Sequence, residues 1–196
     1  MPEGRLLPPE SLTTARLVLR KPSLEDAPLI FNAYAQDPAV TQYLTFRPHR
    51  DLNETYEAVG RFLEGWRSGK TYHWLIFRRD PEELVGAISA REDQGLNLGY
   101  LLARPFWGQG FMSEALGAIV EWAFSVPSVF RVWAVCDLEN DASARLLERN
   151  GFNQEGILRK FSLHPNVSGT PRDCYCYAKT RNDAHSSDSP AQGNRD

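Results

Sequence analysis

The chain has 196 residues, with 25 acidic and 22 basic side chains, and its formal net charge is −3 at pH 7. A chain of this length buries roughly 70% of its unfolded surface, which is enough for one core without disulfide or metal staples. Its 24% charged and 42% hydrophobic residues exclude a disordered or collagen-like chain. The slightly negative balance also disfavours nucleic-acid binding through bulk positive charge.

Targeting and redox signals are those of a cytoplasmic protein. No apolar stretch approaches the ~20 residues of a membrane-spanning helix, and residues 1–10 lack the apolar centre of a signal peptide. We therefore expect no membrane contact and reduced thiols at Cys136, Cys174 and Cys176. The four histidines show no paired spacing, so no metal is predicted.

One continuous domain is predicted over residues 12–181, because this stretch has no repeat, linker or change of composition. Residues 1–11 are expected to form a flexible N-terminus. Residues 182–196 are expected to be a disordered tail, because they contain no branched aliphatic or aromatic side chain that could offset the entropy of ordering.

Apolar periodicity predicts the elements, since a period of two indicates a strand and a period of 3.6 indicates a helix. In chain order they are a strand over 16–20, a helix opening at the capping box 23–26, a helix over 53–68, a hairpin of strands 72–78 and 84–90, a strand over 96–103, a helix after 110, a strand over 129–137, a helix over 141–150, and strands over 152–163 and 173–180. This order predicts an α/β fold with a mixed sheet and helices on its faces.

The segment that joins strand 96–103 to the next helix has the features of an anion site. Gly108 and Gly110 allow a close approach of the backbone, and the first turn of a helix presents unpaired N–H groups. Ser113 can add a hydroxyl donor. An ordinary tight turn would also explain a lone Gly-x-Gly. The chain lacks the further residues of a Walker loop or a dinucleotide fingerprint, so these two nucleotide sites are excluded and another kind of anion site remains.

Five ordered segments together resemble one known family. They are residues 13–20, 99–102, 106–115, 140–152 and 155–159. The chain resembles the GNAT N-acetyltransferase superfamily over residues 12–180, and within it the RimJ/RimL-like branch of ribosomal-protein N-terminal acetyltransferases. The resemblance implies a central, mostly antiparallel sheet, splayed between two parallel strands at 96–103 and 129–137. Acetyl-CoA would lie in that gap.

The resemblance implies that the backbone binds most of this co-substrate. Leu101 and Leu102 would pair with the pantetheine arm, and an N–H near Leu101 would hold the oxyanion. Asn140 would lie near the arm, and a role as a helix N-cap is equally compatible with its position. The pyrophosphate would be bound by Trp107, Gly108, Gln109, Gly110, Phe111, Met112 and Ser113.

The implied reaction is direct attack of a neutral amine on the acetyl thioester. The tyrosine that many family members use as an acid falls at Leu147 here, so that role is not carried over. Ser143 matches a serine of the RimL-like branch and is predicted as the catalytic residue that holds the thiolate or a water. The alternative is a first-turn serine that bonds its own helix.

The general base stays unassigned. The two family glutamates fall at Asn97 and Ser162, and Glu92, Asp93 and Asp173 are nearby acids that could approach the gap. A water chain without a dedicated base would also suffice for an amine whose pKa is already near about 8.

Three functions remain open at this point. The protein acetylates a protein N-terminal α-amine, or it acetylates a small amine such as a polyamine or an antibiotic. The third alternative is an acyl-CoA sensor without catalysis. Many members of the family form homodimers, but the sequence itself does not encode the oligomeric state. No motif encodes the acceptor, because acceptor loops vary freely on one fold.

Overall fold

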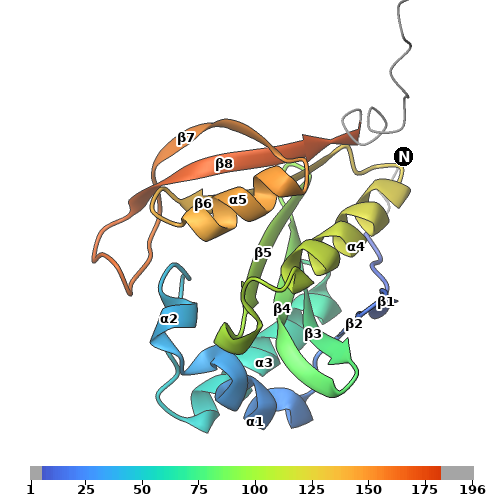
Figure 1. Ribbon diagram of the computed structural model, residues 1–196, viewed down its shortest axis with the longest axis vertical. Coiled ribbons are helices and arrows are strands. Elements are labelled where there is room, and N and C mark those ends of the chain that lie inside the picture. The colour runs from blue at the N-terminus through green and yellow to red at the C-terminus, as the bar shows by residue number, and fades with distance from the viewer. Residues whose placement is uncertain (1–5, 182–196) are drawn as a thin grey trace, which may run out of the picture.

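The structure, a computed structural model, describes residues 6–181 as one eight-stranded sheet with helices on both faces (Figure 1). The strand order is β1-β2-β3-β4-β5-β6-β8-β7. Neighbouring strands are antiparallel except for β5 and β6, which are parallel. The strands are β1 Ser11–Thr13, β2 Leu17–Arg20, β3 Thr71–Arg79, β4 Glu82–Glu92, β5 Leu96–Leu102, β6 Arg131–Asp137, β7 Asn153–Ser162 and β8 Arg172–Thr180. The predicted mixed α/β fold is confirmed.

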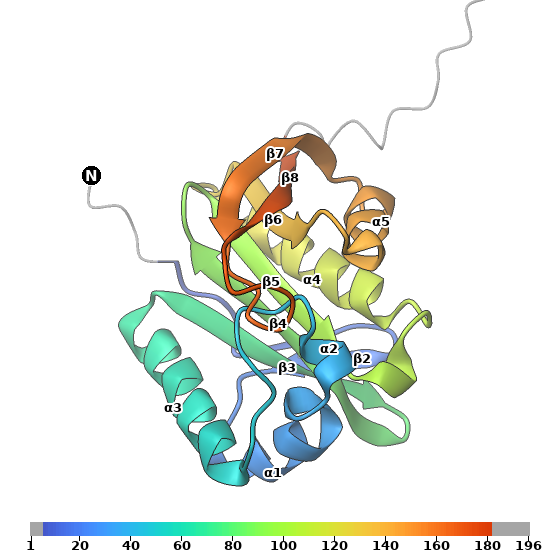
Figure 2. The ribbon, with the colours of Figure 1, turned by 90° about the vertical axis from the view of Figure 1, so that its left-hand side faces the viewer.

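Two long helices cover opposite faces of this sheet (Figure 2). On one face Phe62 of α3 stacks on His73 of β3, and on the other Trp122 of α4 packs against Trp74 of β3. Neighbouring residues of a strand point to opposite faces, so α3 and α4 are separated by the sheet. The helical segments are η1 Leu24–Asp26, α1 Ala27–Ile30, η2 Phe31–Ala35, α2 Pro38–Thr41, α3 Leu52–Ser68, η3 Arg104–Phe106, α4 Phe111–Ser125 and α5 Asp141–Arg149.

The sheet opens between β5 and β6. These strands share only three residue pairs, of which the last joins Leu98 to Ala134. Both strands continue, to Leu102 and Asp137, and each stays paired with its outer neighbour, β4 or β8. A gap therefore forms between the carboxyl ends of the two strands, and the predicted splay is confirmed.

The N-terminal third contains short elements that the sequence pattern does not predict. The helix expected at the capping box does begin there, since the Asp26 carboxylate accepts from the Ser23 N–H at 2.7 Å. It then passes from a 3₁₀ turn through α1 to the π-helical turn η2. β1 and α2 have three and four residues, too few to show a period.

The chain before β1 contacts the domain. Tyr72 donates to the Leu6 carbonyl at 2.6 Å, and the Trp74 indole donates to the Pro9 carbonyl at 2.9 Å. The domain boundary at residue 12 and the flexible segment 1–11 stay predictions, and the expected tail at 182–196 lies outside the described residues. Within 6–181, no helix is long and apolar enough to cross a membrane.

Candidate active site

The loop between β5 and α4 has the backbone geometry of an anion site. Gly108 and Gly110 have φ angles of 74° and 78°, in the left-handed region that glycine adopts without steric cost. Gly110 is the N-cap of α4, and no side chain caps this helix end. The N–H groups of its first turn are therefore open to an anion, at the positive end of a 15-residue helix.

The side chains of this loop leave the backbone accessible. Phe111 and Met112 are buried in the core, and a Cβ added at Gly108 would meet nothing within 4 Å. The Gln109 side chain donates to the Pro105 carbonyl at 2.7 Å, which ties it to the loop itself. An extended phosphate group thus has room to approach the N–H groups, and these residues fit a pyrophosphate.

Two contacts fix the loop to the sheet. The Trp107 indole donates to the carbonyl of Leu102, the last residue of β5, at 2.8 Å. Arg16, just before β2, donates to the Gln109 carbonyl at 3.1 Å and lies over the Phe111 ring at 4.6 Å. The loop is therefore held both by β5, through Trp107, and by the segment before β2, through Arg16.

Ser113 is oriented by a chain of donors from α5 and β8. Lys179 donates to the Asn150 carbonyl, and the Asn150 side chain donates to the Ser113 hydroxyl, both at 3.1 Å. Since this oxygen accepts a bond, its proton remains free to donate to an anion.

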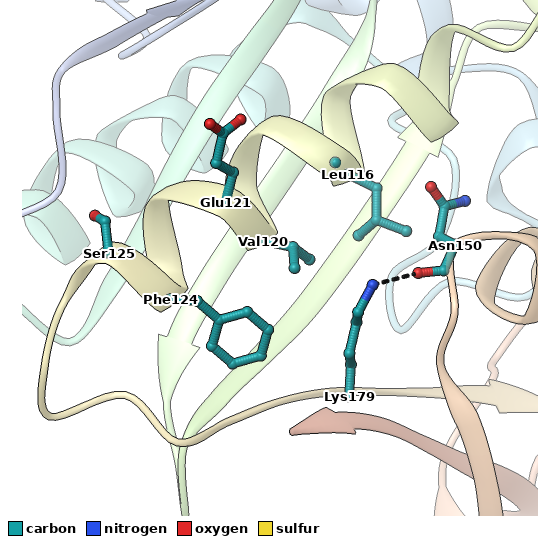
Figure 3. A pocket seen from close by; sticks show the side chains of 8 residues that line it. Leu116, Val120, Glu121, Phe124, Ser125, Asn150 and Lys179 are labelled. Atoms are coloured by element: carbon teal, nitrogen blue, oxygen red, sulfur yellow. Dashed lines mark hydrogen bonds between the residues drawn. The ribbon is translucent and has the colours of Figure 1, made fainter. Parts of the chain in front are cut away.

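The Lys179–Asn150 bond crosses a surface depression of about 460 Å³ (Figure 3). The depression is lined by Leu116, Gly117, Val120, Glu121, Phe124, Ser125, Asn150 and Lys179. It follows α4 toward its C-terminus and so leads away from the gap.

Ser143 faces the gap from the first turn of α5. Asn140 is the N-cap of this helix, and its side chain accepts from the Ser143 N–H at 3.2 Å. The Ser143 hydroxyl lies 2.8 Å from the phenol oxygen of Tyr100 on β5. It also bonds Cys136 on β6, where burial raises the thiol pKa to about 11 and the serine hydroxyl opposes that rise.

The opposite face of the gap carries a buried ion pair. Asp137 ends β6 three residues beyond Ala134, so its side chain points to the other face. Arg172 of β8 contacts this carboxylate at 2.5 and 3.0 Å and also Glu139 at 2.9 Å. Burial favours the neutral acid, but the bonds from Arg172 outweigh it and lower the pKa of Asp137. Both carboxylates at this strand end are therefore held by Arg172.

The acids named as alternatives for a base are engaged elsewhere in the sheet and its turns. Glu92 pairs with Leu96 at the closed start of β5, and Asp93 pairs with Arg91 in the adjoining turn. Asp173 accepts from the Arg159 guanidinium and from a β7 backbone N–H. The sequence places Glu92 and Asp93 near the right strand but does not show at which end β5 and β6 separate.

Two loops approach each other on the Asp137 face (Figure 2). One follows α2, and the other joins β7 to β8. The Asn166 side chain joins them, since it donates to the carbonyls of Thr41 and Phe46 at 2.7 and 2.8 Å. Tyr43 of the first loop lies near Glu139 and Asp137, and burial raises its pKa together with these negative charges.

Four contacts at the site were missed by sequence reasoning. They are Tyr100 with Ser143, Asn150 with Ser113, Arg172 with Asp137, and Asn166 with the loop after α2. Only Tyr100 carries a sequence signal, because it follows Gly99 in a segment already singled out. The other contacts join distant segments and leave no local pattern.

A sheet that opens between two parallel strands, with the N-termini of α4 and α5 at the opening, defines a GNAT-type acyltransferase. The family profile described as acetyltransferase (GNAT) domain matches residues 16–153. The chain belongs to the GNAT family and is an acetyltransferase.

Individual relatives agree with this assignment. The chain is 32% identical to the uncharacterized N-acetyltransferase YoaA of Bacillus subtilis (strain 168), over 85% of this chain and 94% of that protein. It is 27% identical to the ribosomal protein uS5-alanine N-acetyltransferase of Escherichia coli (strain K12), over 90% and 94% of the two chains. A solved RimL ribosomal L7/L12 α-N-protein acetyltransferase in complex with coenzyme A has a TM-score of 0.75 and 25% identity, and the match covers 85% of this chain and 95% of that one.

Proposed function

We propose that this protein transfers the acetyl group of acetyl-CoA to a protein N-terminal α-amine, by direct attack within a ternary complex. The observation that carries the proposal is the opening of the sheet after Leu98 and Ala134, with two helix N-termini at the opening. Such an opening exposes strand backbone to an extended arm and helix N–H groups to its phosphates.

The fit to acetyl-CoA follows the backbone. The N–H groups of residues 108–113 would hold the pyrophosphate, with the Ser113 hydroxyl as a further donor. Ala103 donates to the Val85 carbonyl of β4 at 2.9 Å, so alternation turns the backbone of Leu102 and Tyr100 toward the open edge and that of Leu101 toward β4. We therefore assign the pantetheine and oxyanion contacts to Leu102 and Tyr100 rather than to Leu101.

Acetyl-CoA supplies an activated acetyl thioester. A neutral amine enters from the Asp137 face, the new C–N bond forms as the C–S bond breaks, and one proton passes from the nitrogen to the departing sulfur. Ser143 lies on the other face, where its hydroxyl can donate to the negative charge that develops on sulfur.

The ion pairing of Asp137 and Glu139 favours an α-amine. Asp137 and Glu139 both pair with Arg172, so neither serves as a free base at this strand end. At pH 7 about 10% of an α-amine is neutral, against about 0.04% of a lysine side chain. If neither carboxylate acts as a base, an α-amine is favoured over a lysine side chain by roughly 200-fold. The relative named as a uS5-alanine N-acetyltransferase supports the same acceptor class.

A panel of acceptors tests the proposal through thiol release from acetyl-CoA, followed with a chromogenic thiol reagent. One peptide begins with a free alanine and lacks lysine, a second is identical but N-terminally blocked, and a third is blocked but contains lysine. Spermidine and an aminoglycoside complete the panel. We expect turnover with the first peptide only, and mass spectrometry should place the acetyl group on its α-nitrogen.

The two other functions give distinct results. Turnover confined to spermidine or the aminoglycoside would replace the protein acceptor with a small amine. Tight acetyl-CoA binding without turnover across the panel would indicate a sensor.

A further inference from the structure

We infer that Tyr100 is a positioning residue of the acetyl transfer, which acts through Ser143 by turning the serine hydroxyl proton toward the departing sulfur. This inference rests on the proposed function, in which Ser143 faces the thioester. Many family members carry a tyrosine on the helix that corresponds to α5, where this chain has Leu147. The inference instead gives a supporting role to a tyrosine on β5.

The geometry places three side chains where the strands separate. Tyr100 lies two residues beyond Leu98 on β5, and Cys136 lies two residues beyond Ala134 on β6. Both therefore point to the face of the last pair, which α4 and α5 cover. Ser143 of α5 contacts both side chains, and its hydroxyl oxygen lies 2.8 Å from the phenol oxygen of Tyr100. This cluster lies just beyond the last β5–β6 pair, on the α4 and α5 face of the sheet.

The direction of the Tyr100–Ser143 bond decides what Ser143 can do. A serine hydroxyl has one proton and can accept through its lone pairs. If Ser143 donated to Tyr100, it would have nothing to offer the sulfur. If Tyr100 donates, the serine oxygen is satisfied, and its proton can turn from the Cys136 thiol, which is a weak acceptor, to the departing sulfur. Burial raises the pKa of Tyr100, so the phenol keeps its proton throughout the working pH range, and we assign it as the donor of this bond.

The proton count is unchanged by this arrangement. The proton that ends on sulfur comes from the amine, and neither Tyr100 nor Ser143 is consumed. The pair contributes a polarised hydrogen bond to a developing anion, and such charge-assisted bonds are stronger than neutral ones. Since it is complete before the reaction, it needs no reorganisation in the transition state.

A titration of bound coenzyme A tests the inference without an acceptor. The pH dependence of alkylation of the bound thiol reports its pKa, which is about 8.5 for an ordinary thiol. In the wild-type complex we expect a value about one pH unit lower, because the donor pair stabilises the thiolate. Ser143→Ala should remove this shift, and Tyr100→Phe should remove most of it while the affinity for coenzyme A stays within about threefold.

Kinetics with the α-amine peptide give an independent readout. Tyr100→Phe should lower kcat about tenfold with the KM for acetyl-CoA nearly unchanged. The double variant should be no slower than Ser143→Ala alone, because Tyr100 acts only through that hydroxyl. Tyr56→Phe, on the exposed side of α3, is the matched control and should leave both readouts unchanged.

The outcomes separate the two claims. An unaltered thiol pKa in Tyr100→Phe, or additive losses in the double variant, would overturn the role of Tyr100 while leaving the acetyltransfer intact. Failure of the wild-type protein to bind coenzyme A would overturn the proposed function itself, and the inference with it.

Discussion

The carboxylate of Glu114 accepts hydrogen bonds from the backbone N–H of Arg16 at 2.8 Å and from its Nε at 2.6 Å. Glu114 lies in the first turn of α4, beside the N–H groups that we assign to the pyrophosphate, so its charge would repel a phosphate if it were unpaired. Arg16 neutralises it and also donates to the Gln109 carbonyl. Arg16 thus neutralises the Glu114 carboxylate and holds the loop before α4 in place.

Glu114→Gln should loosen the domain and weaken coenzyme A binding, because Arg16 loses the carboxylate that holds it against the Gln109 carbonyl. Burial alone would raise the pKa of Glu114, but bonds from Thr14 and Arg16 outweigh it and lower the pKa. We expect a loss of about 1–2 kcal/mol of unfolding free energy at pH 7 and a three- to tenfold higher Kd for coenzyme A. Chemical denaturation and calorimetric titration measure these effects.

Glu121→Gln, an exposed change on the same helix, is the control and should leave both quantities unchanged. A coenzyme A affinity in Glu114→Gln equal to that of the wild type would contradict the anchoring role of Arg16.

Gly110→Asp should abolish coenzyme A binding, because it places a carboxylate beside the N–H groups that we assign to the pyrophosphate. The residue has a φ of 78°, so a side chain there adds strain of about 1–2 kcal/mol, which the fold should survive. Gly117→Asp is the matched control, since this glycine lies on the exposed side of α4 with no atom within 4 Å of an added Cβ. Wild-type affinity in Gly110→Asp would show that the anion site lies elsewhere.

How much of the structure can be predicted from the sequence depends on how far apart in the chain the contacting residues are. β5, α4 and α5 each show clear apolar periodicity, so their positions and the anion loop before α4 could be predicted from residues 96–150 alone. The splay came from the family resemblance, because nothing local in β5 or β6 shows where their pairing stops. Tyr100 beside Ser143 is a contact over 43 positions, and Arg172 beside Asp137 one over 35. Such pairs are fixed by tertiary packing.

Asp137→Asn should be strongly destabilising. The Asp137 side chain is fully buried and that of Arg172 is 24% exposed, so removal of the carboxylate leaves a largely desolvated guanidinium without its main partner. Breaking such a pair costs about 3 kcal/mol or more. Asp141→Asn breaks only the exposed pair with Arg145 and should change unfolding free energy by less than about 0.5 kcal/mol. Similar midpoints for the two variants in urea would refute the difference.

His73 should make stability depend on pH between about 4 and 6.5. The ring stacks on Phe62 with centroids 4.1 Å apart, and burial lowers its pKa to about 4. In that window the unfolded chain binds a proton that the folded chain refuses, so stability falls as the pH falls from 6.5 toward 4. The contribution is at most about 3 kcal/mol. Unfolding free energies measured at several pH values should show this slope in the wild type and a shallower one in His73→Gln; parallel slopes would refute it.

Asn166→Ala should affect the acceptor more than acetyl-CoA. Its amide donates to the carbonyls of Thr41 and Phe46, which holds the β7–β8 loop against the loop after α2 on the face through which we propose that the amine enters. Without it two carbonyls lose their donor, at a cost of about 1–2 kcal/mol, and the loops separate. We expect the KM of the peptide to rise at least fivefold while coenzyme A affinity is unchanged. Asn153→Ala, exposed at the start of β7, controls for the substitution, and a peptide KM equal to that of the wild type in Asn166→Ala would show that these loops do not form the acceptor site.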